Sequence, residues 1–397
     1  MARVFSNTPL PLAGFLALAV AMGIGRFAFT PILPMMQADL GVSLAQGGWL
    51  ASANYLGYLL GALSVTALSW SAARLLRRGL WLVVLTTAVM GVDDHWLGWL
   101  LWRLLAGVAS AWVLIGTAAL CIARLSAQGR QKQEGIVFAG VGVGVALAGL
   151  VCMALVVMGA TANQAWLTLA VVAALGLLCA RSLWTAPYDA TGKPGTGGGQ
   201  PVSFESRRGV VSVHAPQWSG APAQDAPTPG KQPLHWHLVL CYGAYGFGYI
   251  LPATFLPAQA RQLVHDPWLF SLAWPVFGLT AAISTLIASR LAKRFSLPRI
   301  WAAAQAIMAV GVLLPALWPT LTSILMAACC VGSTFMIITM TGLQQAQAAL
   351  GAFRAKRQMA AMTASFALGQ LVGPVFFSLT HTWFGAPLAF ALIAGTV

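Results

Sequence analysis

Two arginines, Arg26 and Arg103, stand inside long apolar stretches of this chain of 397 residues. A charge in the hydrocarbon of a bilayer costs at least about 2.5–3.5 kcal/mol, so arginines there usually mark a binding site or a paired charge. Arg26 has two interpretations. In the first, it is an anion-binding cation that faces a central cavity. In the second, it is a structural arginine bonded to backbone carbonyls where Gly23, Gly25 and Pro31 loosen the helix. The sequence leaves both open.

Arg103 lies about 10 Å along its helix from the end that carries Asp93 and Asp94. An Arg–Asp pair here would hold an outer gate or relay a proton, and an interfacial salt bridge is the alternative. No acid falls at the middle of an apolar stretch, so proton coupling has few candidate groups. Two buried arginines without a central acid favour an anion or a neutral molecule as cargo over a lipophilic cation. The chain has eight acids: Asp39, Asp93, Asp94, Glu134, Asp189, Glu205, Asp225 and Asp266.

Several further polar and aromatic residues lie on stretches that would line a cavity between helices. They are predicted to bind substrate together with Arg26, and the alternative is that the aromatic ones pack or anchor at the interface. Four glycines at 140, 142, 144 and 149 are expected to let helices approach closely. The predicted substrate-binding residues are Tyr249, Asn54, Tyr242, Tyr245, Trp274 and Gln370.

Twelve apolar stretches carry these residues, and each is read as a membrane-spanning helix. The chain is 59% hydrophobic and 8% charged, with a mean hydropathy of +0.79, which is outside the range of soluble proteins. Lipid leaves unpaired backbone groups without partners, so such stretches cross it as helices of about 20 residues. The expected helices are 10–36, 46–70, 79–92, 96–123, 133–158, 163–186, 235–260, 267–291, 299–317, 319–345, 357–380 and 384–397.

Positive charge is segregated along the chain. Nearly all of the 22 Lys and Arg residues lie in every second gap between the apolar stretches. The positive-inside rule places those gaps, and both termini, in the cytoplasm. We therefore expect a multi-pass protein of a bacterial inner membrane. The net charge of +14 suits anionic lipid headgroups, and no nucleic-acid-binding signature accompanies it. The six cysteines lie in apolar segments without metal-ligand spacing, so neither a metal site nor a disulfide framework is expected.

The chain divides into two related halves. Residues 187–234 are rich in Gly, Pro and Ser and read as a flexible cytoplasmic linker. It separates an N-terminal six-helix bundle (1–186) from a C-terminal one (235–397). Gly23-Ile-Gly25-Arg26 aligns with Gly246-Phe-Gly248-Tyr249, which pairs Arg26 with Tyr249 across the halves. Parallel repeats of this kind enclose the substrate site of many transporters near the midplane.

Four segments resemble one branch of a known family. They are GIGRFAFTPILPMM, VFAGVGVGVALAG, YGFGYILPATFLP and MAAMTASFALGQLVGP, and they resemble the uncharacterised YbfB/YjiJ-like branch of the major facilitator superfamily. The resemblance implies an all-α membrane protein with twelve transmembrane helices in two six-helix parallel repeats. Arg103, Gly107 and Ala111 are similar to a signature of proton-coupled members. The loop SWSAARLLRRG lacks the family's Asp, and Lys293 stands where its second copy expects an acid, which puts the associated conformational lock in doubt.

These observations predict a secondary transporter that moves a small organic solute by alternating access. It would need no cofactor and would not be an enzyme. Its expected partners are a small-molecule substrate, a proton as coupling ion and the lipid bilayer, and we expect a monomer. The alternatives are a membrane-embedded transferase, for which His95 beside Asp93 and Asp94 is the sole candidate cluster, or a non-transporting sensor. Import and export are not distinguished.

Overall fold

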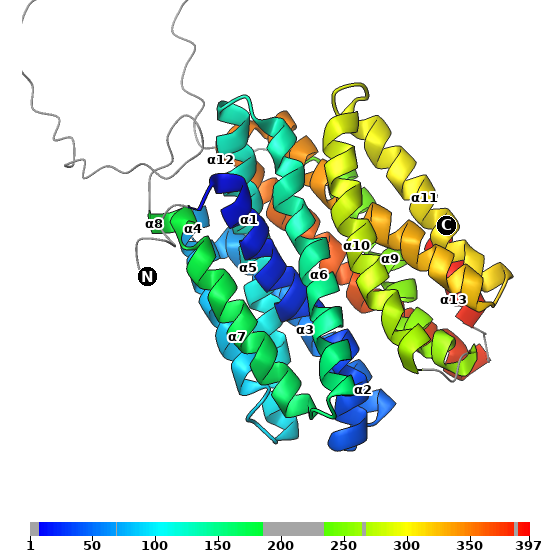
Figure 1. The fold of residues 1–397 in the computed structure, drawn as a ribbon. Coiled ribbons are helices and arrows are strands. Elements are labelled where there is room, and N and C mark those ends of the chain that lie inside the picture. The colour runs from blue at the N-terminus through cyan, green and yellow to red at the C-terminus, as the bar shows by residue number, and fades with distance from the viewer. Residues whose placement is uncertain (1–7, 69, 186–233, 264–266, 385–387) are drawn as a thin grey trace, which may run out of the picture.

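The computed structural model describes residues 8–68, 70–185, 234–263, 267–384 and 388–397, and in these ranges every regular element is a helix (Figure 1). Except for its last residue, the linker predicted at 187–234 lies outside the described residues. Eight of the described helices are long and apolar enough to cross a membrane. Large apolar side chains on their outer surface, such as Leu97 and Leu317, are exposed, as expected where lipid is the solvent.

The first half begins with an interrupted helix. The stretch predicted at 10–36 is α1 (Leu10–Leu18), then a π-helix η2 (Ala19–Phe27), then α2 (Phe29–Asp39). π-Helical turns are rare and often occur at functional sites. The other elements of this half are α3 (Leu44–Ala67), α4 (Ala72–Val89), α5 (Trp96–Ala127), the 3-10 turn η3 (Gln131–Gln133), α6 (Glu134–Val157), α7 (Ala162–Ala180) and α8 (Ser182–Thr185).

Polar caps fix several helix starts. The Ser43 hydroxyl accepts from the backbone N–H of Gln46, and the backbone N–H of Ser43 donates to the Gln46 side chain in return. Thr161 and Gln164 do the same at α7. Such reciprocal bonds satisfy two free donors at a helix N-terminus. α4 begins at Ala72, capped by Ser71, about two turns before the predicted start at 79. Hydropathy missed these turns because they contain three arginines.

The second half consists of α9 (Trp236–Leu263), α10 (Pro267–Leu291), α11 (Leu297–Leu317), α12 (Leu321–Phe384) and α13 (Leu388–Thr396). α12 joins the two helices that were predicted at 319–345 and 357–380, and its two membrane-spanning stretches are Leu321–Leu350 and Ala355–Phe376. In a straight helix Phe335 and Phe366 would be about 45 Å apart, yet both contact Tyr245. The element therefore folds back on itself, and the described helices make the predicted twelve segments, six in each half.

The two halves lie side by side, with the blue-to-green helices on one side and the yellow-to-red helices on the other (Figure 1). Between them, α6 packs on α10 and α3 packs on α12. Gly142 of α6 lies against the backbone of Gly278 and Ala282 of α10, and Gly144 lies against Gly23 of η2. No side chain fits at these crossings, which confirms that glycines allow close helix contact here.

Candidate substrate site between the halves

Arg26 lies in the π-helix and reaches across to the second half. Its Nη2 donates a hydrogen bond to Oε1 of Gln370 on α12, and only 3% of its surface is exposed. The sequence predicted both residues as substrate ligands without indicating that they bond each other. The bond places a buried cation on the contact surface of the two halves.

The charge of Arg26 is only partly compensated. Its guanidinium carbon lies 3.9 Å from the centre of the Tyr58 ring and 5.5 Å from that of Tyr55. A cation–π contact contributes about 2 kcal/mol when desolvated, whereas burying an ion costs several kcal/mol. Among the described residues, no carboxylate lies within ion-pair distance of Arg26. The site therefore carries a net positive charge with no anion to match it.

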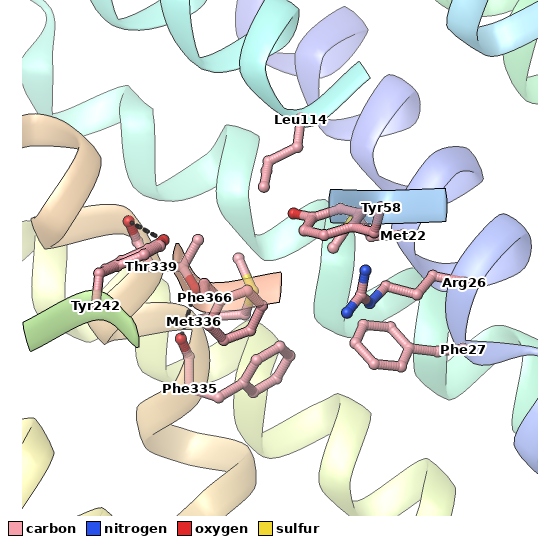
Figure 2. Close-up of a pocket in the computed structure, with 10 residues that line it drawn as sticks. All are labelled: Met22, Arg26, Phe27, Tyr58, Leu114, Tyr242, Phe335, Met336, Thr339 and Phe366. Atoms are coloured by element: carbon pink, nitrogen blue, oxygen red, sulfur yellow. Dashed lines mark hydrogen bonds between the residues drawn. The ribbon is translucent and has the colours of Figure 1, made fainter. Parts of the chain in front are cut away.

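A narrow cavity lies next to this guanidinium. Its free volume is about 10 Å³, roughly what the centre of one water needs, so the site is closed in this conformation. Figure 2 shows its walls facing each other from the two halves. The first half provides Met22, Arg26, Phe27, Tyr58 and Leu114, and the second half provides Tyr242, Phe335, Met336, Thr339 and Phe366.

The polar atoms left without partners around Arg26 can all donate hydrogen bonds. Arg26 Nε and Nη1, the hydroxyls of Tyr58 and Tyr249, and Gln370 Nε2 are buried and have no partner. The arginine and amide nitrogens donate only, while the two hydroxyls can also accept. A buried polar group without a partner costs about 1–3 kcal/mol. A ligand rich in acceptor oxygens would satisfy this set, and a carboxylate is such a ligand.

The wall opposite Arg26 is flat and apolar. The ring of Tyr249 stacks on Phe335 at 5.4 Å between centroids, and Tyr245 stacks on Phe366 at 4.8 Å. Phe27, next to Arg26, meets the Phe335 ring edge-on at 6.1 Å. A ligand that separates the halves would thus place its charged end on the first half and its apolar body against aromatic rings of the second.

The structure brings some predicted ligands to this cavity and not others. Tyr242 lines it, and the buried Tyr249 lies within electrostatic reach of Arg26. The Tyr245 hydroxyl donates to the carbonyl of Phe335 at 2.8 Å, which leaves its ring as a wall. Trp274 packs edge-on against Phe27 at 6.3 Å, with its indole N–H unpartnered. Asn54 lies in the contact of α3 with α5, where its Nδ2 donates to the Arg103 carbonyl at 3.0 Å.

Arg103 and the acids predicted as its partners are not brought together. Arg103 Nη1 donates to the carbonyl of Gly25 at 3.5 Å, and its guanidinium lies 4.5 Å from the centre of the Phe29 ring. It thus steadies the end of the π-helix. Asp93 accepts instead from the Trp102 indole at 2.8 Å and from the His95 backbone N–H at 3.0 Å. These bonds, that of His95 first, lower the pKa of Asp93.

The candidate transferase cluster is an exposed turn. The side chain of His95 is 92% exposed and its Nδ1 lies 3.2 Å from Asp93 Oδ1, while Asp94 is exposed. Within the described ranges, no group of three His, Cys, Asp or Glu side chains is arranged to hold a metal ion.

Sequence reasoning missed most of the second-half wall. Phe335, Met336, Thr339 and Phe366 lie on α12, in apolar runs where nothing distinguishes cavity-lining from lipid-facing positions. Tyr58 carried a weak signal because it lies one helical turn after Asn54 and Tyr55. Its close contact with Arg26 depends on how η2 packs on α3, which spacing does not reveal.

Comparisons with known proteins agree with this architecture. The profile of a protein family described as "Uncharacterised MFS-type transporter YbfB" matches residues 18–199 and 210–397. No curated protein matches the chain. The crystal structure of the human organic anion transporter MFSD10 (TETRAN) is similar with a TM-score of 0.65 and 14% identity, over 98% of this chain and 95% of that one. The transporter FucP in the outward conformation is similar with a TM-score of 0.64 and 14% identity, over 97% and 95%.

Proposed function

The chain belongs to the major facilitator superfamily, in the family of YbfB-type transporters, and from this premise we propose that its cargo is a small monovalent organic anion. Membership establishes a multi-pass membrane transporter. The cargo is inferred from the buried, unmatched guanidinium of Arg26 and the unpartnered donors around it. At 14% identity the likeness to an organic anion transporter concerns the fold, so the proposal rests on the site.

Alternating access follows from where the ligand would bind. Arg26 belongs to the first half and Gln370 to the second, and their hydrogen bond closes the cavity. An anion entering between them would take over donors of both residues and bind the open and closed states with different affinity. Differential affinity is what shifts a conformational population. Of the residues that the structure describes, Arg26 is the one charged side chain that lines the cavity, which favours a monoanion.

The orientation in the membrane is part of the proposal. Arg74, Arg77 and Arg78 begin α4, and Lys132 precedes α6, all at one end of the bundle. We call this end the basic side. The positive-inside rule assigns it to the cytoplasm of a bacterial inner membrane, with both termini on the same side.

Binding by the purified protein tests the cargo class. Butanoate and benzoate should raise the melting temperature, whereas benzamide and benzylamine, of similar size but neutral or cationic, should not. Arg26→Gln should lose the response to both anions. Arg77→Gln, which removes an exposed arginine on the basic side, is the matched control and should keep it. Equal responses to benzoate and benzamide, or an unchanged response in Arg26→Gln, would contradict an anionic cargo and leave the family assignment intact.

A further inference from the structure

Glu134, at the start of α6, is the one buried acid among the described residues, with 2% of its surface exposed. Its Oε2 accepts a hydrogen bond of 2.6 Å from Nε2 of Gln344 on α12. The bond joins the two halves on the basic side, at the opposite end of α6 from the loop that leads to α7. Neither residue belongs to the cavity around Arg26.

The surrounding contacts close the basic side. Gly135 lies so near the carbonyl of Thr285 and the side chain of Ser289 that an added Cβ would be 2.7 Å from both. Lys356 of α12 donates a hydrogen bond of 2.6 Å to the carbonyl of Trp70 after α3. The bond between Glu134 and Gln344, like that of Lys356, is therefore a polar bridge across a closed contact.

No cation neutralises Glu134. Within the described part of the chain, no basic side chain lies within ion-pair distance of it. Among neighbouring groups, the Cys121 thiol lies within electrostatic reach of both Arg124 and Glu134. Lys132 and Lys293, from opposite halves, are so close that Lys132 lowers the pKa of Lys293, and Arg290 adds to this effect. The titratable and charged groups of the packed elements near this end of α6 are Cys121 and Arg124 on α5, Arg130 and Lys132 before α6, Arg290 at the end of α10 and Lys293 after it.

The energies disfavour an ionised Glu134 in this contact. Burying a carboxylate in a contact without water has a large desolvation cost. One hydrogen bond to the charged group and the N-terminus of a helix return only part of that cost.

A proton would complete the pair. Gln344 Oε1 is buried and has no partner. A carboxamide presents an N–H and a C=O side by side, and a neutral carboxylic acid presents the complementary C=O and O–H. Protonated Glu134 therefore accepts from Gln344 Nε2 and donates to Gln344 Oε1. Ionised Glu134 has no hydrogen to donate, and Oε1 stays unsatisfied.

We infer that Glu134 and Gln344 form a proton-dependent latch between the halves, in which a proton on Glu134 holds the basic side closed. When the basic side opens, Glu134 meets water, releases its proton to that side and becomes ionised. Reclosing then requires a proton from the same side. The latch goes beyond the cargo proposal, because it acts without substrate.

The sign of the pH effect follows from linkage. The closed state binds the proton more tightly, so raising the pH favours opening, and the ratio of closed to open molecules falls by up to about tenfold per pH unit. Repulsion between Lys132 and Lys293 works in the opposite direction, because these lysines lose charge as the pH rises and closure then becomes easier. The two effects are thus distinguishable by sign.

Distances between spin labels test the latch in substrate-free, full-length protein in lipid nanodiscs. The six native cysteines are replaced by alanine, and labels are placed at the exposed positions Ser126→Cys on α5 and Phe295→Cys after α10. Between pH 5 and pH 9, the short distance should give way to a longer one. Glu134→Gln, a neutral side chain of the same shape, should keep the short distance throughout this range.

Two controls separate the latch from other causes. Asp39→Asn removes an acid that bonds the N–H of Ala162 elsewhere and should leave the pH response unchanged. Gln344→Leu, which removes the latch partner, should favour the long distance at every pH. A distance that does not depend on pH in the parent protein, or the parent's pH response in Glu134→Gln, would overturn the inference. Neither result would bear on anion binding at Arg26.

Discussion

Two of the buried charges of this transporter, Arg26 and Glu134, sit in opposite surroundings. Arg26 lies at the centre, beside unpartnered groups that donate hydrogen bonds, and Glu134 lies at the basic side, where the unpartnered atom of its partner Gln344 is an acceptor. Each charge is at the contact of the two halves, and neither has an ion of opposite sign within reach in the described structure. Among these described residues, the site of Arg26 therefore lacks hydrogen-bond acceptors, and the site of Glu134 lacks a hydrogen-bond donor.

The difference indicates what completes each site. A guanidinium keeps its proton under all ordinary conditions, so the deficit at Arg26 has to be met by an anion from outside. A carboxylate can be neutralised by a single proton, so Glu134 needs no ligand. One site thus senses cargo and the other senses pH, and the same closing motion of the halves responds to both.

The largest effect is expected from removing the central charge without leaving a buried polar partner. In Arg26→Met with Gln370→Leu, an unmatched ion and its single partner become apolar. Replacements of this kind are often stabilising by about 1–4 kcal/mol. We expect a higher melting temperature together with complete loss of anion binding, measured by thermal unfolding and calorimetry. A large loss of stability would mean that Arg26 holds the fold together, as in the structural interpretation.

Two glycine substitutions separate packing within a half from packing between the halves. At Gly23 a Cβ would overlap the Gly144 backbone in the first half, and at Gly135 it would press on Thr285 and Ser289 across the contact. Overpacking costs about 1–3 kcal/mol. Gly23→Ala should lower the melting temperature, whereas Gly135→Ala should mainly open the basic side in the label-distance measurement. Equal unfolding penalties without opening would contradict this division.

Substitutions at Tyr58 test whether its ring stabilises the buried guanidinium of Arg26 when no anion is bound. Tyr58→Leu removes the ring that faces the guanidinium at 3.9 Å and should destabilise the closed state by about 1–2 kcal/mol. Tyr58→Phe keeps the ring and removes only the unpartnered hydroxyl, so it should be at least as stable as the parent. Thermal unfolding gives the melting temperature of each variant. Equal melting temperatures for Tyr58→Leu and Tyr58→Phe would show that the cation–π contact does not stabilise Arg26.

The smallest effect concerns the outer turn. Hydrogen bonds from His95 and Trp102 lower the pKa of Asp93, so its ionised form stabilises the fold above the usual value of about 4 and this contribution is lost as the pH falls below it. Because Asp93 lies on an outer turn and is partly exposed to solvent, the change should be slight. Asp93→Asn should therefore reduce the loss of melting temperature between pH 5 and pH 3. An unchanged slope would show that these bonds contribute nothing to stability.

Much of the architecture was predictable, because in lipid each spanning segment must be helical and apolar. The positions of the helices and the importance of Arg26 follow from that constraint. The π-helix at Ala19–Phe27 was not predictable, since its contacts with Gly144 and Arg103 exist only in the folded bundle. The pairing of Arg103 with Asp93 was wrong, because Asp93 bonds His95 in its own turn and Trp102 at the start of α5. The bond of Gln344 to Glu134 could not be predicted, because the sequence does not indicate which distant residue an amide on an apolar helix will contact after folding.

Uptake into proteoliposomes tests the central claim most directly. The labelled probe is the carboxylate that raises the melting temperature most, and parent protein is compared with Arg26→Gln and Arg77→Gln at equal incorporation. Saturable uptake is expected for the parent and for Arg77→Gln. In Arg26→Gln, kcat/KM should be lower by about thirtyfold or more, because losing one partner of a buried charge pair costs about 2–5 kcal/mol. Uptake by Arg26→Gln at the parent rate would contradict an anionic cargo bound at Arg26.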